Sequence, residues 1–550
     1  MRRAKTSSRR SGSSATPPSA TLDMGGQPPQ LRLWHIALLA LMAAGLMILP
    51  TFEPVLWPLA WVALVPILFA LRSISVKRAF LLGWWMEAFA TWIGFYWLIG
   101  TMVNFGHISV PFSWVLFATI GLGNGIRLGL YTGWLRWVAA HTGPTWYRLL
   151  IPPCTFVMLD YLYPRVFPWA LGITQWAATP LTQIADVTGV HGMTFLLVSF
   201  SVMITAFIPH ATAPSPAARW HMGLACLLLT SAALGYGFWR MPQIRTAMQA
   251  AAPLRVAVVQ PNIGFDEKGD RAIRLAQFEQ QIDLSRATLA GRPDLIIWPE
   301  TMYPYAVPST EKSLGLPILK DAPNAHWLIG ALVYHRQGND FQRFNAALLV
   351  DSSSRIIDRY AKRRLLAFGE RIPMEGYFPF LRHISPTIGD LTPGTGGVVT
   401  LPNGIHIGPL ICYEDILPDM GRQAVQQGAA LLVNLTNNAW FGPTYAPYQH
   451  RQLAAFRAIE NRVYLVRATN TGLTSIIDPL GREHDALPTD QPGTRVHTIQ
   501  PLRMPTIYTQ YGDWFAQLCS AIALLLPLWY WRSSRWQRHQ TAPVGIQGKT

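Results

Sequence analysis

The chain has 550 residues, of which 50% are hydrophobic and 13% charged, with a mean hydropathy of +0.20. A soluble domain carries roughly 25% charged residues, so this composition excludes a disordered chain, a fibrous chain and an ordinary soluble enzyme, and it indicates membrane spans. The four cysteines are too few and too scattered for a disulfide framework or a zinc site. They are Cys154, Cys226, Cys412 and Cys519.

The net positive charge of +16 is concentrated in three segments that flank apolar runs. Residues 1–32 carry a net +5, residues 72–78 carry +3 and residues 532–550 carry +4. Basic residues in such places set the orientation of a membrane protein, so we predict a topology signal and no nucleic-acid partner. The first segment is rich in Ser, Pro, Gly and Arg and is predicted to be a disordered cytoplasmic tail. The last segment is predicted to be a second basic cytoplasmic tail.

Eight apolar runs are candidates for membrane-spanning helices, each of which needs about 20 mostly apolar residues. The fifth run is the weakest because it contains Pro152, Pro153 and Asp160. Asp160 and Glu87 would be costly facing lipid, so we expect them to face the bundle or lie near an interface. The runs are 33–49, 55–71, 79–99, 110–139, 149–163, 187–208, 220–239 and 514–531.

An even number of spans agrees with basic tails at both ends of the chain. Together with the basic loops, it places both termini in the cytoplasm and residues 241–510 outside. We therefore predict a bundle of about seven spans over residues 33–240, an extramembrane domain over 241–510 and a last span over 511–531.

The segment 241–510 holds most of the acidic residues and has no apolar run of 20 residues. Its short β-rich runs alternate with helical runs, which is typical of a layered α/β domain. Helices are predicted at 271–289, around 423–427 and at 448–463. Strands are predicted at 254–260, 294–298, 327–334, 346–351, 405–412 and 430–435, with a final strand pair at 464–469 and 474–478.

Two of the predicted strands end at a reactive group. Glu300 follows the strand in LIIWPET, Cys412 follows the strand in GPLICYED, and Lys362 and Glu370 lie between them in RYAKRRLLAFGERIP. Residues past the carboxyl ends of strands tend to line the site in α/β sheets. Each residue alone also has a simpler interpretation: a core cysteine, a helix N-cap for Glu300, a solvated basic face for Lys362 and a surface turn for Glu370.

Together, however, Glu, Lys and Cys form a chemical unit. A free thiol has a pKa of about 8.5 and is a poor nucleophile at neutral pH unless it is assisted. A carboxylate in a partly dry pocket accepts the thiol proton, and a nearby ammonium stabilises the thiolate and then the oxyanion. Because the product of the attack is a thioester, we predict two-step acyl transfer.

The motifs around these residues resemble those of the nitrilase, or carbon-nitrogen hydrolase, superfamily, whose catalytic set is Glu-Lys-Cys. WPE at 298–300, Lys362 and CYE at 412–414 match in order. The more specific resemblance, over about residues 33–531, is to the apolipoprotein N-acyltransferase family, the membrane-bound branch. It rests on VVQPNI at 258–263, FGERIP at 368–373, TNNAWFG at 436–442, ATNTG at 468–472 and YGDW at 511–514, with FPW at 167–169 and GVHGMTFLL at 189–197 in the membrane part.

This resemblance implies a multi-span helical bundle in the bacterial inner membrane, with an α-β-β-α sandwich on its periplasmic side. It implies that Cys412 is the nucleophile, Glu300 the base and Lys362 the oxyanion stabiliser, and no metal or cofactor is expected. The supporting residues it implies are Glu370, which holds Lys362, Tyr413 and Glu414, which position the nucleophile, and Asn438, Trp440 and Phe441 in a substrate loop.

The sequence departs from the family pattern at three places. Leu366-Ala367 stands where Val-Pro is usual, and Asn438 replaces an Asp. Gly269 stands near the place of a Trp that often follows the Gln-Pro-Asn strand. None of these departures removes a catalytic group.

The implied reaction has two halves. Cys412 takes an acyl chain from a membrane phospholipid, and the α-amine of the diacylglyceryl-cysteine at the N-terminus of an apolipoprotein then takes it from the thioester. We expect a monomer. Two alternatives stay open: a membrane-anchored amidase or nitrilase in which water attacks the thioester, and a lipoprotein-binding module whose nitrilase domain is inactive. Eight spans are excessive for an anchor, and the intact Glu-Lys-Cys set argues against the second alternative.

Overall fold

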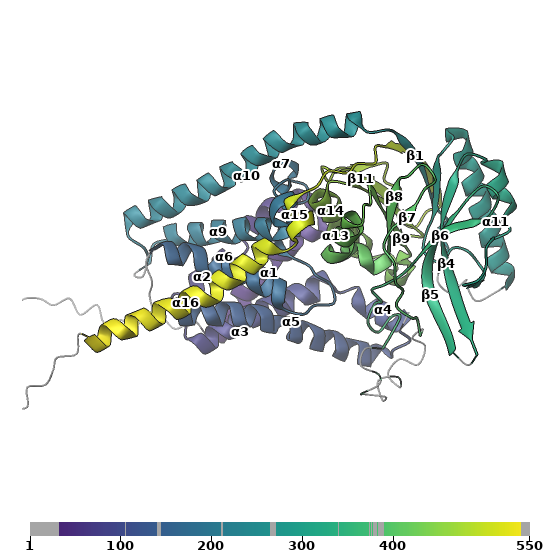
Figure 1. Ribbon diagram of the computed structural model, residues 1–550. Coiled ribbons are helices and arrows are strands. Elements are labelled where there is room, and N and C mark those ends of the chain that lie inside the picture. Colours follow the sequence, from purple (N-terminus) through teal and green to yellow (C-terminus); the bar gives the residue numbers. More distant parts are fainter. Residues whose placement is uncertain are drawn as a thin grey trace, which may run out of the picture.

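The computed structural model of the chain describes residues 32–104, 106–139, 145–210, 213–264, 271–338, 340–372, 375, 377, 382 and 390–540. Of the expected N-terminal tail only Arg32 is described, and Gly269 and residues 541–550 lie outside these ranges. Figure 1 shows two parts: helices from residues 33–250 and 514–540 lie at one end, and an α/β part from residues 254–499 lies at the other.

Helices coincide with all eight apolar runs, but α3 (Val76–Gly94) ends within the third run, and the second run is not one helix. It is divided into a 3-10 helix, η1 (Pro54–Trp61), and the short α2 (Val65–Ala70), because Pro58 and Pro66 each lack a backbone donor and fix φ. The other helical elements of this part are α1 (Leu33–Phe52), α3 (Val76–Gly94), α4 (Leu98–Asn104), α5 (Val110–Ala139), α6 (Thr145–Leu162), η2 (Leu171–Gln175), α7 (Thr179–Thr182), α8 (Ala185–Thr188), α9 (Val190–Phe207), α10 (Pro216–Ala250), α15 (Ile507–Tyr511) and α16 (Trp514–Gln540).

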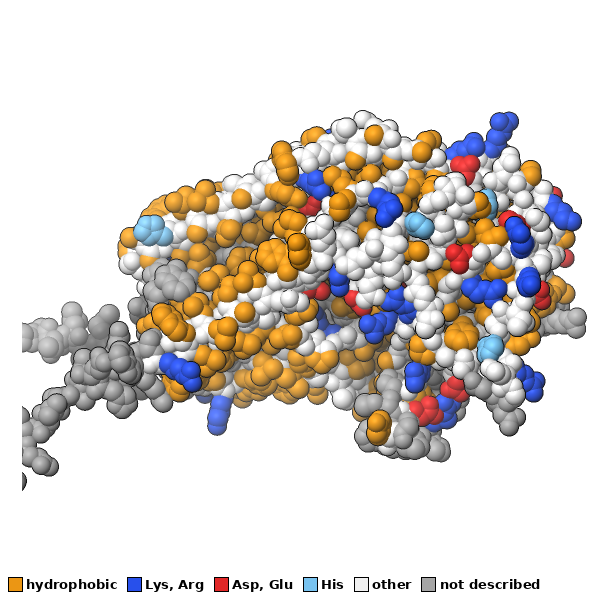
Figure 2. All heavy atoms as spheres, in the orientation of Figure 1, with side chains coloured by type: hydrophobic (Ala, Val, Ile, Leu, Met, Phe, Trp, Pro, Cys, Tyr) orange, Lys and Arg blue, Asp and Glu red, His pale blue; other side chains and the backbone are white. Residues whose placement is uncertain are grey.

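Among the described residues, four helices are long and apolar enough to cross a membrane: Leu33–Phe52, Val190–Phe207, Pro216–Ala250 and Trp514–Arg532. On the face that Figure 2 shows, hydrophobic side chains cover much of the helical part, whereas charged side chains gather mainly over the α/β part. Leu227 on α10 and Leu525 on α16, for example, are 63% and 64% exposed. An apolar surface of this kind is typical of a face that meets lipid or another protein.

The two carboxylates expected to avoid lipid both face the interior of the helical part. Arg127 of α5 donates to Glu87 of α3 from Nη2 at 2.5 Å, and from Nη1 to Asp160 of α6. All three side chains are buried. A buried charge is tolerated only when it is paired and hydrogen-bonded, and this trio joins three helices around one guanidinium.

The helix α10 continues past the predicted domain boundary at residue 240. It ends at Ala250, and the first strand begins at Leu254. A helix of 35 residues is about 52 Å long, whereas a bilayer core is about 30 Å thick. The apolar run at 220–239 therefore predicted only part of α10. The more polar residues after it continue the helix to the α/β part.

Two sheets form the α/β part. One has the strand order β13-β1-β2-β4-β5-β6 with β3 beside β4, and the other has the order β12-β11-β10-β9-β8-β7. The neighbours β1, β2 and β4 are parallel, as are β8, β9 and β10. The strands are β1 (Leu254–Gln260), β2 (Leu295–Trp298), β3 (Val307–Pro308), β4 (His326–Gln337), β5 (Asp340–Val350), β6 (Ile356–Ala361), β7 (Val399–Thr400), β8 (His406–Ile411), β9 (Leu431–Thr436), β10 (Tyr464–Thr469), β11 (Ser475–Ile477), β12 (Glu483–His484) and β13 (Gly493–Ile499).

The sheets pack face to face, and helices cover both outer faces (Figure 1). Val258 and Ile297 from one sheet share a core with Val433 and Val466 from the other. The helix α11 (Arg271–Thr288) packs on the outer face of the first sheet, and α13 (Pro418–Gln426) and α14 (Ala446–Asn461) pack on the second. This arrangement is the α-β-β-α sandwich that the sequence predicts.

The prediction of a final strand pair at 464–469 and 474–478 is wrong in its position in the chain. The pair exists as β10 and β11, which run antiparallel, but it is not the final pair. Both β12 and β13 follow it, and β13 pairs antiparallel with β1 from Leu254↔Ile499 to Gln260↔Gly493. The last strand of the chain thus closes the edge beside the first.

The helical part and the α/β part are joined through buried polar side chains. Gln449 of α14 accepts from Trp97 Nε1 at 2.9 Å and donates to the Gly94 carbonyl at 2.8 Å. Arg462, directly after α14, donates to Asp186 of α8 at 3.0 Å. These bonds fix α14 against the helix ends, and α14 belongs to the layer that lies beside Cys412.

Candidate active site

The predicted Glu, Lys and Cys lie at the carboxyl ends of three strands. Glu300 is two residues beyond β2, Lys362 directly follows β6, and Cys412 directly follows β8. The strands β2 and β6 belong to one sheet and β8 to the other. The structure therefore brings the three residues together where the edges of the two packed sheets meet.

Lys362 is the centre of this cluster and is 1% exposed. Its Nζ lies 2.8 Å from Glu370 Oε1 and 3.6 Å from Glu300 Oε1. Burial opposes the ammonium charge, but the negative charges of Glu370, Cys412 and Glu300 outweigh it and raise the pKa of Lys362 above its usual value. Lys362 is thus a fixed cation at neutral pH, which suits a group that must stabilise an oxyanion.

Glu300 is held by hydrogen bonds to both of its carboxylate oxygens. Asn345 Nδ2 donates to Oε1 at 2.7 Å, and the Asn437 backbone N–H donates to Oε2 at 2.9 Å. Burial raises the pKa of Glu300, Lys362 and the two donors oppose the rise, and Glu370 adds to it. A carboxylate with a raised pKa accepts a proton more readily than one in water, as a general base must.

Cys412 begins a one-turn 3-10 helix, η6 (Cys412–Ile416), and has a φ of +51°. A non-glycine residue in the left-handed region is strained by roughly 1–2 kcal/mol, and such strain concentrates at functional sites. Burial raises the pKa of the Cys412 thiol to about 12, Glu300 and Glu370 reinforce the rise, and Lys362 and Thr436 oppose it. The thiol is therefore protonated at neutral pH and needs a base.

The turn after Cys412 is fixed by Glu414, which is fully buried. Glu414 accepts backbone N–H bonds from Ile411, Arg363 and Arg364 at 2.7–3.0 Å, and a hydroxyl bond from Tyr360 at 2.9 Å. Three of these donors flank Lys362, and the fourth directly precedes Cys412. Glu414 thereby couples the positions of the lysine and the cysteine.

Tyr413 points away from this cluster and toward the helical part. Its hydroxyl donates to the Val166 carbonyl, and its ring lies 6.3 Å from that of Phe167 in an edge contact. Of the two neighbours of the nucleophile predicted to position it, Glu414 therefore contacts the α/β part and Tyr413 the helices.

Glu370 lies beside Lys362 and is not a free surface turn. Its Oε1 accepts from Lys362, and its Oε2 accepts from the Leu366 backbone N–H at 2.8 Å. Asn345 Nδ2 also lies 3.4 Å from Glu370 Oε1. Leu366 differs from the usual family residue, but it makes this bond through its backbone, so the departure leaves the contact intact.

A narrow cavity of about 40 Å³ opens beside Cys412. Its walls come from both parts of the molecule: Phe95, Trp97 and Phe167 belong to the helical part, and Phe441 and Leu453 to the α/β part. The wall is thus largely aromatic and aliphatic. An apolar wall beside the Cys412 thiol favours an apolar group of a substrate over a polar one.

The predicted substrate loop lies next to this cavity, but its residues differ in exposure. Asn438 is buried, and a Cβ on Gly472 would lie 2.1 Å from its Nδ2, so it packs against the strand ends. Trp440 and Phe441 are partly exposed. Phe441 lines the cavity and meets the Trp97 ring at 4.8 Å between centroids.

Two asparagines that hold Glu300 were missed in the sequence. Asn345 lies within β5, and Asn437 caps the short helix η7 (Asn438–Phe441) by accepting from the Ala439 N–H at 3.2 Å. Asn470 donates to Asn437 Oδ1 at 2.9 Å and so supports it. Asn437 lies in the family motif TNNAWFG and Asn470 in the motif ATNTG, so both could have been found from the sequence. Asn345 lies in no such motif.

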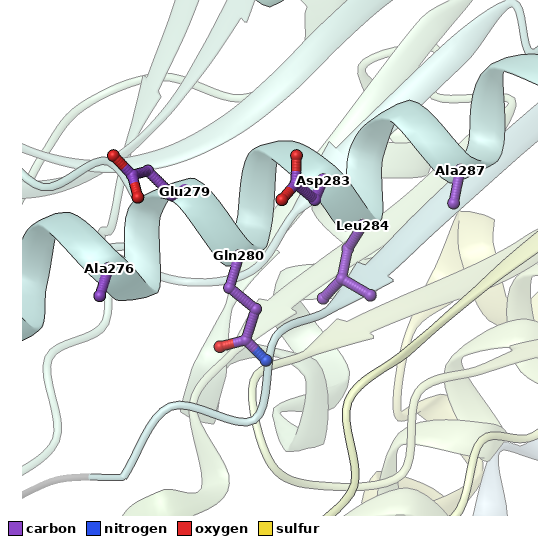
Figure 3. A pocket seen from close by; sticks show the side chains of 6 residues that line it. All are labelled: Ala276, Glu279, Gln280, Asp283, Leu284 and Ala287. Carbon is purple, nitrogen blue, oxygen red and sulfur yellow. The ribbon is translucent and has the colours of Figure 1, made fainter.

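A second hollow, along α11, has no part in this cluster. Figure 3 shows its six lining residues on the one helix: Ala276, Glu279, Gln280, Asp283, Leu284 and Ala287. None of them is a residue of the Glu-Lys-Cys set. Within the described part of the chain, no group of three or more His, Cys, Asp or Glu side chains is placed to hold a metal.

The sandwich fold and its match to a known family define the class of protein. Residues 255–506 match the carbon-nitrogen hydrolase family, and residues 43–203 match the apolipoprotein N-acyltransferase N-terminal domain. The chain is 34% identical to the apolipoprotein N-acyltransferase of Geobacter metallireducens, covering 89% of this chain and 94% of that protein. It is 31% identical to that of Bdellovibrio bacteriovorus, covering 80% and 84%.

Among solved structures, the nitrilase-superfamily protein Nit3 of Saccharomyces cerevisiae is similar with a TM-score of 0.34 and 18% identity, covering 45% of this chain and 90% of that one. The chain belongs to the apolipoprotein N-acyltransferase family, and its carbon-nitrogen hydrolase domain fits acyl transfer through a cysteine. The resemblance drawn from the sequence motifs is thereby confirmed.

Proposed function

We propose that the protein moves an acyl chain from a membrane phospholipid to Cys412, and from Cys412 to the α-amine of a diacylglyceryl-cysteine at the N-terminus of an apolipoprotein. The observation that carries this proposal is the position of Cys412. It lies beside the buried Glu300 and Lys362 and the half-buried Glu370, at the edge of an apolar cavity that both parts of the molecule build. No cofactor enters the proposed reaction.

In the first half-reaction the Cys412 thiol gives its proton to Glu300 as sulfur attacks the ester carbonyl of the phospholipid. The carbonyl oxygen becomes an oxyanion, and Lys362 stabilises it. The carbon–oxygen bond then breaks, the lysophospholipid oxygen takes the proton back from Glu300, and a thioester remains on Cys412. Glu370 keeps Lys362 in place through its 2.8 Å contact.

In the second half-reaction the neutral α-amine attacks the thioester carbonyl. Glu300 accepts the amine proton, because an α-amine has a pKa of about 7.7–8.0 and must lose a proton to form an amide. The carbon–sulfur bond breaks, and Glu300 returns the proton to the Cys412 sulfur. The products are the triacylated lipoprotein and the free enzyme.

The same proposal includes the membrane arrangement. Residues 33–240 form the bundle, residues 241–510 lie on the periplasmic side of the inner membrane, and residues 511–531 form the last span of a monomer. The basic segments 72–78 and 532–550 support this orientation, and four apolar helices among the described residues support the membrane spans. Since α10 extends to Ala250, its last residues stand outside the bilayer.

The test is an incubation of the purified protein with a labelled phospholipid, followed by intact mass and a lipopeptide chase. A thioacyl adduct that passes to the lipopeptide amine is expected. Loss of the adduct to water alone would favour the amidase alternative, and no adduct would favour a binding module. Cys412→Ala must abolish the adduct, whereas alanine at the three buried cysteines, Cys154, Cys226 and Cys519, must leave it.

A further inference from the structure

A third cavity, of about 550 Å³, lies in the helical part at the end away from Cys412. Its wall is mostly apolar and includes Leu135, Val138, Ile151 and Val202. The helix α10 begins at Pro216, directly after the lining residues Ala213 and Pro214, and ends at Ala250, just before β1. Figure 1 shows that α10 runs along the helical part to the α/β part. The cavity and the α/β part therefore lie at opposite ends of α10.

The helix α9 shows how far the cavity lies from the α/β part, which carries the Glu-Lys-Cys cluster. At its first residue, the Val190 N–H donates to Glu460 of the α/β part at 3.3 Å, and near its other end Thr205 lines the cavity. Fifteen residues at 1.5 Å each separate these points by about 22 Å. The cavity is therefore a separate site.

Two half-buried arginines line the cavity, Arg72 and Arg136. Arg72 donates to the carbonyls of Ile208, at 3.0 Å, and Thr205, and Arg136 donates from Nε to the Ile74 carbonyl at 2.6 Å. Their partners among the described residues are thus carbonyl oxygens, which carry no full negative charge. Each guanidinium has five N–H donors, so both retain donors for a further acceptor.

No carboxylate balances these two arginines within the described part of the chain. The acidic residues between positions 24 and 250 are Glu53, Glu87, Asp160 and Asp186. Glu87 and Asp160 pair with Arg127, and Asp186 pairs with Arg240 and Arg462. Glu53 follows α1, whose Phe52 contacts Tyr445 of the α/β part. None of these four acidic residues therefore pairs with Arg72 or Arg136. The two guanidinium charges line an apolar cavity without a neighbouring carboxylate among the described residues.

We infer that this cavity holds an anionic phospholipid, with its phosphate between Arg72 and Arg136 and its acyl part against the apolar wall. The inference rests on the proposed membrane arrangement, which puts this end of the helices in the cytoplasmic leaflet. Basic pockets between helices on that side suit anionic headgroups. The lipid at this site does not donate its acyl chain, because about the length of α9 separates the cavity from the α/β part that carries Cys412.

The experiment uses the full chain with Cys412→Ala in detergent, so that no thioester forms and a failure of acyl transfer cannot affect the reading. The protein is titrated with dioleoyl phosphatidylglycerol and, separately, with dioleoyl phosphatidylcholine, and bound lipids are counted by native mass spectrometry. We expect one molecule of phosphatidylglycerol to bind per chain, and we expect no phosphatidylcholine to bind at the same site. R72Q/R136Q is expected to weaken its binding about thirtyfold, as two guanidinium–phosphate contacts would supply.

The matched control is R336Q/R495Q, which removes the same charge from two exposed arginines of the α/β part and should leave lipid binding unchanged. R72K/R136K keeps both charges and should retain the preference for phosphatidylglycerol. Equal affinity of the unaltered cavity for the two lipids would overturn the inference, even if R72Q/R136Q fails to fold. Unchanged binding in a folded R72Q/R136Q, or displacement of the lipid by millimolar inorganic phosphate, would overturn it as well.

Discussion

The thiol of Cys412 is expected to react as a protonated thiol and not as a preformed thiolate. Burial raises its pKa to about 12, so its ionised fraction at pH 7 is about three thousandfold below that of an ordinary cysteine with a pKa of about 8.5. Alkylation by iodoacetamide, measured with the other three cysteines changed to alanine, should rise about tenfold per pH unit from 7 to 10. A plateau near pH 8.5 would contradict this prediction.

Glu300→Gln should slow both the formation and the turnover of the thioacyl adduct by about 10²–10⁴-fold, the usual contribution of a general base. The wild-type acylation rate should fall as the pH drops through the pKa of Glu300, because only the ionised carboxylate accepts a proton. Since burial raises that pKa, the fall begins above the usual value of about 4.3. Single-turnover acylation against pH checks both points, and a wild-type chase rate in Glu300→Gln would refute the base assignment.

Glu370→Gln separates a positioning role from a catalytic one. If Glu370 holds Lys362, acylation should slow but not stop, because the ammonium keeps Glu300 as a neighbour at 3.6 Å. The same single-turnover measurement, with the exposed Glu311→Gln as the control, checks this expectation. Wild-type rates in Glu370→Gln would remove Glu370 from the site, and complete loss of the adduct would show that it does more than hold the lysine.

The Glu-Lys-Cys cluster could be located from the sequence because each member follows an apolar strand or sits in a family motif. The residues that orient this cluster could not. Asn345 faces Glu300 only because β5 pairs antiparallel with β4 in the register Leu332↔Asn345, and register is a property of the folded sheet. The raised pKa of Cys412 likewise depends on the burial of its side chain, which cannot be predicted from a sequence motif.

At the level of elements, the turn after β8 depends on Glu414. Glu414→Gln leaves one acceptor oxygen for four donors and turns an amide N–H₂ toward some of them. Leaving buried donors unsatisfied costs about 1–3 kcal/mol of unfolding free energy each, and acylation should also slow because Cys412 and Lys362 lose their common anchor. Thermal unfolding and single-turnover acylation measure the two effects, and an unchanged melting temperature would disprove this role of Glu414.

The sequence predicted a strand well where most of its side chains are buried and therefore apolar. It predicted a strand poorly where most side chains are not buried. LRVAVVQ at 254–260 is buried at six of seven positions and was predicted with its observed bounds. GTRVHTI at 493–499 is β13, yet only Ile499 is buried, so its sequence carries no continuous apolar run. The second apolar run was divided by prolines, whose effect on a helix depends on the neighbours that satisfy the freed carbonyls.

For the whole molecule, reporters should place Gly338 and the C-terminus on opposite sides of the membrane. Gly338 lies at the exposed turn between β4 and β5, and one apolar helix, Trp514–Arg532, separates it from the basic C-terminal segment. Alkaline phosphatase should be active when inserted at Gly338 and inactive at the C-terminus, because cytoplasmic segments carry the excess of Lys and Arg. Activity at both positions would show that α16 does not cross.

The pairing of β13 with β1 means that the first sheet is completed only late in synthesis. Glu300, Lys362 and Cys412 all emerge before β13, but β1 has its full set of backbone partners only when Gly493–Ile499 arrives. Until then the exposed edge of β1 is free to pair with another chain, and contacts so distant in sequence form late. A nascent chain halted before residue 493 would therefore carry Glu300, Lys362 and Cys412, and we expect it to depend on chaperones to avoid aggregation.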